Sequence, residues 1–321
     1  MTELENIRPI RKVSKDYPVL GTWCELTLYG GYDTALLDGA YHLIQYYESL
    51  FTVNHDGSEV MRINRSAGDR AAEVSHATYT LVKRAVNESR QHYGFNAAIG
   101  PLVKLWHIGF EDSRVPTDVE IAERLKLINP DDIVFNDDNC NVYLPQAGME
   151  LDLGGIAKGY IADRIQDFFK AYGYTAGIIN LGGNLLVIGE APHHADGKWR
   201  VGIRNPLEQA DEAILTITTG ASSVVTSGVA ERRFKADDKS YHHIIDPMTG
   251  YPHDNDIASV TVLSQESIDG ELETTRLFFA DGPLPGYDRG AIFIYQDKSI
   301  ELVNLSQDAV DISNPEFYFV N

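Results

Sequence analysis

The chain has 321 residues, of which 43% are hydrophobic and 23% are charged. These proportions are typical of a folded protein, and the length suits one elaborated domain or two closely packed lobes. The formal net charge is -20 at pH 7, so the molecule as a whole repels polyanions. A nucleic-acid partner is therefore not expected, and a phosphate-bearing ligand would need local cations, a metal ion or a helix N-terminus to receive it.

Cysteine content and the N-terminal sequence bear on the cellular compartment. Cys24 and Cys140 lie far apart, without the CxxC spacing of a zinc site and without a disulfide framework. Residues 1–21 contain no apolar signal-peptide core, and no run of about 18 apolar residues occurs in the chain. We therefore expect a cytoplasmic protein with reduced thiols and no stable membrane insertion.

The first half of the chain predicts a strand followed by helices. Residues 22–29 form a strand-like run, and residues 34–50 place apolar side chains at helical spacing. A second helix is expected over 75–93, with Ser75 as its N-cap and Gly94 at its end. Residues 117–128 predict a short helix, and the runs IVF and NVYL around NDDNCN predict a hairpin.

The second half alternates strands, glycine turns and helices. From residue 150 the order is strand, glycine turn, helix, apolar strand, second glycine turn and strand. Later runs (WRVGIR, AILTITT, SVVTSG, YHHIID and ASVTVL) predict strands, followed by a helix near 267–280 and the runs AIFIYQ, IELVNL and FYFV. No repeat or long linker interrupts this order, which predicts an α+β fold of mixed or antiparallel sheets covered by helices. We expect a single unit over 1–321, with residues 1–16 as an N-terminal extension.

The most informative motif is LDLGGIAKGYIAD, residues 151–163. Gly154 and Gly155 lie between an apolar strand and an amphipathic helix, where the backbone can approach a ligand closely. The amides of such a turn can receive an anion, a carbonyl can bind a hard cation, and Lys158 can meet a phosphate. The alternative is an ordinary strand-to-helix turn with a solvated lysine. The spacing matches neither a dinucleotide-binding GxGxxG turn nor a P-loop.

Two further segments carry polar groups. Gly182 and Gly183 follow an apolar strand, where an ordinary hairpin turn is the alternative interpretation. Thr226-Ser227-Gly228 is followed by the sequence HHIIDP at 242–247, in which histidine or aspartate can accept a proton. A histidine pair in ordinary strands, with an Asp-Pro turn, is the structural alternative.

An acidic segment is expected on the helix near 267–280. Glu271 and Thr275 are four residues apart, so on a helix their oxygens share one face and can bind one hard cation such as Mg²⁺. A solvated, acidic helix N-terminus is the alternative. Ordinary hydrolases are not indicated, because the chain has no GxSxG nucleophile motif and no distinctive pair of glycosidase carboxylates.

These segments, in this order and spacing, resemble the ApbE family of FAD:protein FMN transferases over almost the whole chain. The matching elements, in chain order, are the turn Leu20-Gly21-Thr22, Ser58 and Asn64 around a short helix, Gly100-Pro101-Leu102 to Trp106, and then the four segments above. The resemblance implies the T-fold-like α+β architecture of that family.

The resemblance also implies a set of site residues. FAD would lie between the glycine turns and the segments around Ser227 and His243, with FAD-binding positions at Leu20, Asn54, Asn96, Ala97, Ala98, Asp152, Gly154, Gly155, Lys158, Tyr160, Gly182, Gly183, Ser227, His243 and Ile245. The metal would be Mg²⁺, bound by the carbonyl of Ala157 and by Glu271 and Thr275, with Thr274 alongside.

The implied reaction transfers the FMN part of FAD to a Thr or Ser hydroxyl of an acceptor protein with an FMN-binding domain, and releases AMP. The catalytic residues would be Lys158 at the phosphates and His243 or Asp246 as the group that accepts the hydroxyl proton. Two alternatives stay open: a Mg²⁺-dependent FAD pyrophosphatase that gives FMN and AMP, and a non-catalytic FAD-binding protein.

Three positions depart from the family pattern. Glu271 stands where the family usually has aspartate, so its carboxylate reaches one methylene further; both residues bind magnesium, and we expect activity to survive. Leu20 replaces a common methionine, and Asn96-Ala97-Ala98 replaces Asp-x-Thr beside the flavin pocket. Many members are exported lipoproteins, whereas no lipobox is present here. The acceptor is therefore expected to be cytoplasmic, or a membrane protein with a cytoplasmic FMN-binding domain.

Overall fold

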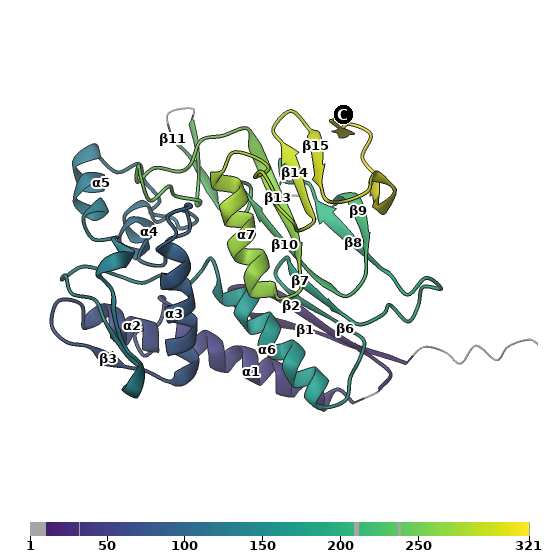
Figure 1. The fold of residues 1–321 in the computed structure, drawn as a ribbon, viewed down its shortest axis with the longest axis horizontal. Helices are drawn as coiled ribbons and strands as arrows, with labels where there is room; N and C mark the ends of the chain where they lie inside the picture. Colours follow the sequence, from purple (N-terminus) through teal and green to yellow (C-terminus); the bar gives the residue numbers. More distant parts are fainter. Residues whose placement is uncertain (1–10, 32, 209–211, 237–238, 321) are drawn as a thin grey trace, which may run out of the picture.

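The computed structural model describes residues 11–31, 33–208, 212–236 and 239–320. Its central element is a nine-stranded sheet in the order β1-β2-β6-β7-β10-β13-β14-β15-β17 (Figure 1). These strands are β1 (Lys12–Val19), β2 (Thr22–Tyr29), β6 (Gly177–Leu181), β7 (Asn184–Ile188), β10 (Ser222–Gly228), β13 (Ile257–Ser264), β14 (Ala291–Tyr295), β15 (Ser299–Val303) and β17 (Tyr318–Phe319). Neighbouring strands are antiparallel except β15 and β17, which are parallel.

One face of this sheet is covered by helices and the other by a smaller sheet. Helices α1 (Ala35–Phe51), α6 (Ala157–Ala171) and α7 (Ser267–Phe279) pack on the first face (Figure 1). On the second face lies a three-stranded sheet of β16 (Val310–Ile312), β9 (Ala213–Thr219) and β8 (Trp199–Arg204). Each face has its own apolar core, because alternate residues of a strand point to opposite sides.

A helical lobe extends from the edge of these layers. It contains α2 (Glu59–Arg65), α3 (His76–Ser89), α4 (Gly100–Trp106), α5 (Asp118–Leu125) and the small sheet of β3 (Ala72–Glu73), β5 (Asn141–Tyr143) and β4 (Val134–Asn136). A hairpin of β11 (Arg233–Ala236) and β12 (Lys239–His242) packs on this lobe, where Tyr241 contacts the buried Trp106. Short 3₁₀ segments occur at Pro130–Asp132, Asp137–Asn139 and Gln307–Ala309.

The predicted α+β class is confirmed, as are most of the predicted elements. Strand β2 has the expected bounds, Ser75 caps α3 through Thr78, and β4 and β5 form the expected hairpin. The helix expected near 267–280 is α7. Within the described ranges, every helix is too short or too polar to cross a membrane.

Two predicted boundaries differ from the structure. Residues 12–16, expected in an N-terminal extension, belong to β1 and pair with β2, whereas residues 1–10 lie outside the described part of the chain. The expected strand YHHIID ends at His242, because the following backbone turns to bond elsewhere. The amide of His243 donates to the Arg232 carbonyl (3.1 Å), and that of Asp246 donates to the Tyr251 carbonyl (2.8 Å).

Candidate active site

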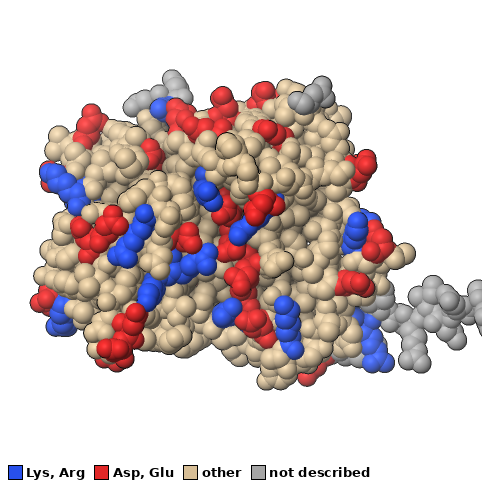
Figure 2. Space-filling view, in the orientation of Figure 1, with Lys and Arg blue, Asp and Glu red and all other residues tan. Residues whose placement is uncertain are grey.

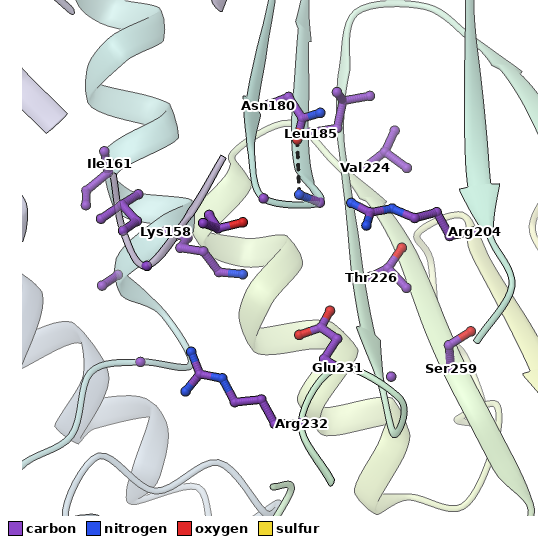
Figure 3. A pocket seen from close by; sticks show the side chains of 18 of the residues that line it. Lys158, Ile161, Asn180, Leu185, Arg204, Val224, Thr226, Glu231, Arg232 and Ser259 are labelled. Atoms are coloured by element: carbon purple, nitrogen blue, oxygen red, sulfur yellow. Dashed lines mark hydrogen bonds between the residues drawn. The ribbon is translucent and has the colours of Figure 1, made fainter. Parts of the chain in front are cut away.

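A cleft of about 1090 Å³ opens beside the N-terminal end of α6, between the glycine turns and strand β8 (Figure 3). Eight of the positions that the sequence analysis assigned to ligand or metal line it: Leu20, Asn54, Asp152, Gly154, Ala157, Lys158, Gly182 and Gly183. These residues come from four separate parts of the chain, so the fold assembles the cleft from the motifs that the sequence carries.

On one wall of the cleft, the Leu20-Gly21-Thr22 turn packs against the turn that contains Gly182 and Gly183. Gly182 and Gly183 have φ values of 64° and 98°, so the hairpin between β6 and β7 requires residues that tolerate the left-handed region. A Cβ at Gly182 would lie 2.4 Å from the Thr22 side chain. The Leu20-Gly21-Thr22 turn and the second glycine pair therefore form one continuous surface, which neither motif reveals alone.

The turn at Gly154 and Gly155 presents the N-terminus of α6 to the cleft. The side chain of Asp152 accepts a hydrogen bond from the Gly154 amide (2.7 Å), which closes the turn, and burial raises the pKa of that carboxyl group. Helix α6 begins at Ala157, so the positive end of its dipole and Lys158 face the same space. This combination can receive a phosphate group in a protein of net charge -20.

The cleft contains further charged and polar groups that the sequence analysis missed. Arg204 and Arg232 add two cations, Glu231 adds a carboxylate and Ser259 adds a hydroxyl group, beside Thr226 of the predicted Thr226-Ser227-Gly228 segment (Figure 3). Apart from Thr226, these residues have no recognisable spacing in the sequence. The Ser259 hydroxyl is buried and has no hydrogen-bond partner among the described residues. Because an unpaired buried hydroxyl is costly, a polar atom of a bound ligand could supply the partner that this group lacks.

Glu271 lies in the interior of the protein, on α7. It is 7% exposed, its Oε1 atom accepts a hydrogen bond from Asn184 Nδ2 (2.8 Å), and burial raises its pKa. The hydroxyls of Thr274 and Thr275 donate to its backbone carbonyl (3.0 and 3.1 Å), and Thr274 also bonds Ser227 (2.8 Å). The alternative of a solvated acidic helix end is therefore wrong for this residue.

The oxygen atoms of Glu271, Thr274 and Thr275 are of the kind that binds a hard cation. Among the described residues, no three His, Cys, Asp or Glu side chains gather at one place. A metal at this position would therefore rely on one carboxylate together with carbonyl and hydroxyl oxygens, which is the ligand chemistry of Mg²⁺ and not of zinc. Burial raises the pKa of Glu271, and the positive charge of Lys158 opposes part of this rise.

The two adjacent histidines have different environments. His242 uses both ring nitrogens, since Nε2 bonds the His253 carbonyl (2.9 Å) and Nδ1 accepts from the Ile244 amide (3.3 Å). His243 bonds the Arg232 carbonyl through Nδ1 (3.3 Å), which makes Nδ1 the protonated nitrogen and leaves the Nε2 lone pair as an acceptor. Burial lowers the pKa of His243 to about 4, so the ring is neutral at pH 7.

The other predicted site residues lie around the cleft without lining it. Asn96, Ala97 and Ala98 are buried beneath the Asp152 turn, where the Ala97 carbonyl accepts from the Asp152 amide (2.8 Å). Tyr160 packs edge-on against Tyr47 and Phe51, and Gly155 faces Phe95. Ile245 lies in the core around Trp106. The Asp246 carboxylate accepts a hydrogen bond from the Met248 amide (2.8 Å).

Helix α7 is held from outside by ion pairs. Figure 2 shows basic and acidic side chains interspersed on the face of the molecule that carries α3 and α7. Asp269, in the first turn of α7, bonds Arg84 of α3 and Arg289 of the loop before β14, both at 2.9 Å. These contacts fix the helix that presents Glu271 to the interior.

Comparison with known proteins agrees with the architecture and with the motifs. Residues 20–285 match the sequence profile of the ApbE family. A protein of Klebsiella pneumoniae (strain 342) named FAD:protein FMN transferase is 41% identical over 300 residues, which cover 93% of this chain and 90% of that protein. A protein of Treponema pallidum (strain Nichols) with the same name is 32% identical, covering 96% of this chain and 91% of that protein.

Solved structures give the same result for the fold. The ApbE protein of Thermotoga maritima matches with a TM-score of 0.83 at 27% identity, covering 92% of this chain and 97% of that one. The flavin transferase ApbE of Vibrio cholerae shares the fold with a TM-score of 0.77 at 24% identity, covering 96% and 99% of the two chains. With a profile match over most of its length and two relatives at 41% and 32% identity, this chain belongs to the ApbE family.

Proposed function

We propose that the protein is an FAD:protein FMN transferase, which moves the FMN part of FAD to a Thr or Ser hydroxyl of an acceptor protein and releases AMP. The observation that carries this proposal is the position of Lys158. It lines the cleft at the N-terminus of α6 together with Arg232, and its charge acts on His243, whose pKa burial lowers to about 4, and on Glu271, whose pKa burial raises. The names of the relatives support the same activity.

The residues of the chain would divide the reaction as follows. Lys158, Arg232 and the N-terminus of α6 bind the pyrophosphate of FAD. The acceptor hydroxyl oxygen attacks the phosphorus of the FMN half, and its proton passes to Nε2 of His243, which is neutral at pH 7. The bond from that phosphorus to the bridging oxygen breaks, and AMP leaves with the oxygen.

Mg²⁺ is part of the proposal. The carbonyl of Ala157, the carboxylate of Glu271 and the hydroxyl of Thr275, with Thr274 alongside, are the groups that would hold it. When bound, the ion would supply positive charge to the pyrophosphate and so favour departure of AMP. Between the two proton acceptors that the sequence predicts, the geometry favours His243, because the Asp246 carboxylate is engaged in its own turn.

The test is to mix the protein with FAD, MgCl₂ and a candidate acceptor that carries an FMN-binding domain. We expect flavin fluorescence on the denatured acceptor together with released AMP, and loss of both on addition of EDTA. The variant Lys158→Gln should release much less AMP. If AMP appears without labelled acceptor for every acceptor tried, the protein is a pyrophosphatase; bound FAD without AMP identifies a flavin carrier. The acceptor and its cytoplasmic location stay predictions.

A further inference from the structure

Asn184, at the start of β7, connects the glycine-turn wall of the cleft to Glu271. It follows directly after Gly182 and Gly183 and is 2% exposed. Its Nδ2 atom donates to Oε1 of Glu271 (2.8 Å), and its Oδ1 atom accepts from the hydroxyl of Ser267 (2.8 Å). The side-chain amide is thus bonded at both ends to helix α7, inside the protein.

With Glu271 ionised, as metal binding requires, the chemistry of the three groups allows only one arrangement of these bonds. An ionised carboxylate is an acceptor only, so the NH₂ group of Asn184 has to face Glu271 and its oxygen has to face Ser267. The Ser267 hydroxyl must then donate. The reverse orientation of the amide would place two acceptor oxygens in contact inside a buried site, which is costly.

Ser267 is itself anchored to the helix that carries Lys158. Its backbone amide and that of Ile268 donate to the two carboxylate oxygens of Asp163 on α6 (2.7 and 3.0 Å). Asp163 and Ser267 are both buried, at 6% and 0% exposure. The start of α7 is therefore fixed relative to α6, and Ser267 provides a rigid reference point for the Asn184 amide.

We infer that Asn184, oriented by Ser267, is a positioning residue that holds the Glu271 carboxylate ready to bind the metal ion. This inference rests on the proposed function, because it concerns the same metal site. Glutamate has three side-chain torsions, and an unrestrained carboxylate loses that freedom on binding a metal. A hydrogen bond from a buried, doubly bonded amide removes much of this cost beforehand, as outer partners of metal ligands commonly do.

The experiment measures metal binding without turnover. Mn²⁺ replaces Mg²⁺ as a paramagnetic probe, and its affinity is determined by EPR titration of the full chain, alone and with FAD but without acceptor. We expect Asn184→Leu to weaken Mn²⁺ binding about 10- to 100-fold. Ser267→Ala keeps the Asn184 amide but removes the donor that orients it, so it should weaken Mn²⁺ binding less. If Asn184→Leu does not fold, Ser267→Ala provides the test of the positioning role.

The matched control is Asn255→Leu. Asn255 lies just before β13 and contacts the C-terminal end of α7. Asn255 Nδ2 donates to the Phe278 carbonyl (2.9 Å), so this variant also removes a bond to α7 but does not touch Glu271. It should lower the melting temperature and leave Mn²⁺ affinity unchanged. If the parent protein binds Mn²⁺ and the Asn184 and Ser267 variants bind it equally well, the positioning role is wrong while the proposed function stands. If the parent protein itself binds no Mn²⁺, the metal-dependent function fails, and this inference with it.

Discussion

A Cβ atom placed on Gly159 would lie 2.6 Å from the backbone carbonyl oxygen of Ser267, closer than real Cβ contacts. Helices α6 and α7 touch at this point through their backbones. Gly159 comes directly after Lys158 in the chain, and Ser267 is the first residue of α7, which carries Glu271. The close contact therefore sets how far the phosphate-binding end of α6 lies from the buried carboxylate.

Gly159→Ala should disturb this contact. The new methyl group would push against backbone atoms that cannot rotate away, which typically costs about 1–3 kcal/mol. We expect a lower melting temperature and a drop in FMN transfer, since α7 has to shift away from Lys158. The control Gly220→Ala introduces a Cβ that meets nothing within 4 Å and should change neither property. A Gly159→Ala protein with parental stability and rate would contradict the packing argument.

The two neighbouring histidines allow a matched test of proton transfer. His243→Ala should lower the rate of FMN transfer about 10²- to 10⁴-fold while FAD still binds, because the acceptor hydroxyl loses its base. The parental rate should fall as the pH drops through about 4, where His243 becomes protonated.

His242→Ala is the control. His242 packs against Phe278 and bonds backbone only, so its loss should lower stability and leave the transfer rate of the folded protein nearly unchanged. Normal turnover by His243→Ala at every pH, with normal FAD binding, would exclude His243 as the base.

Ser259→Ala tests the unpaired hydroxyl of the cleft. Removing a buried group without a partner should leave the free energy of unfolding of the ligand-free protein unchanged or slightly raise it. FAD binding should weaken by about fivefold, as expected for one lost hydrogen bond of about 1 kcal/mol. Titration of FAD by fluorescence, with urea unfolding in parallel, separates the two effects. Unchanged FAD affinity would show that the hydroxyl does not meet the ligand.

Asp163→Asn should change how stability depends on pH. Burial raises the pKa of Asp163 from 3.8 to about 6, so the unfolded chain releases this proton at a lower pH than the folded protein does. The stabilising contribution of the group is present below about 4 and is lost as the pH rises through about 6. The parental free energy of unfolding should therefore fall, relative to the variant, by on the order of 2–3 kcal/mol across this interval. Urea unfolding at pH 4, 5, 6 and 7 measures the difference, and parallel curves would disprove it.

Glu271→Asp tests the departure from the family pattern that the sequence analysis infers at this position. The shorter side chain moves the carboxylate away from Asn184 Nδ2, to which Glu271 Oε1 bonds at 2.8 Å. We expect transfer to survive, with a Mg²⁺ concentration for half-maximal rate that is several-fold higher, because the amide no longer holds the ligand. A lower Mg²⁺ requirement would show that the extra methylene of Glu271 hinders the site.

Many features of this protein can be read from its sequence. The pattern of apolar residues predicted β2, α1 and α3, since burial of one face leaves a regular pattern in the residues that form it, and a helix was also expected where α7 lies. The motif LDLGGIAKGYIAD and the second glycine pair predicted two walls of the cleft, and both line it. The elements and the glycine turns could be recognised because each depends on residues that are neighbours in the chain, whereas the binding of FAD by these turns stays a prediction.

The tertiary structure alone decided which groups meet. Asn184 and Glu271 are 87 residues apart, and Asp163 lies 104 residues before Ser267, yet both pairs form buried hydrogen bonds. Their contact depends on how α6 crosses α7 at Gly159, and no local pattern records a crossing between two helices. The sequence thus determined the elements and the family, because local propensity and burial act along the chain. The orientation of Glu271 and the surroundings of His243 depended on the fold, because side-chain pairing is set by distances in space.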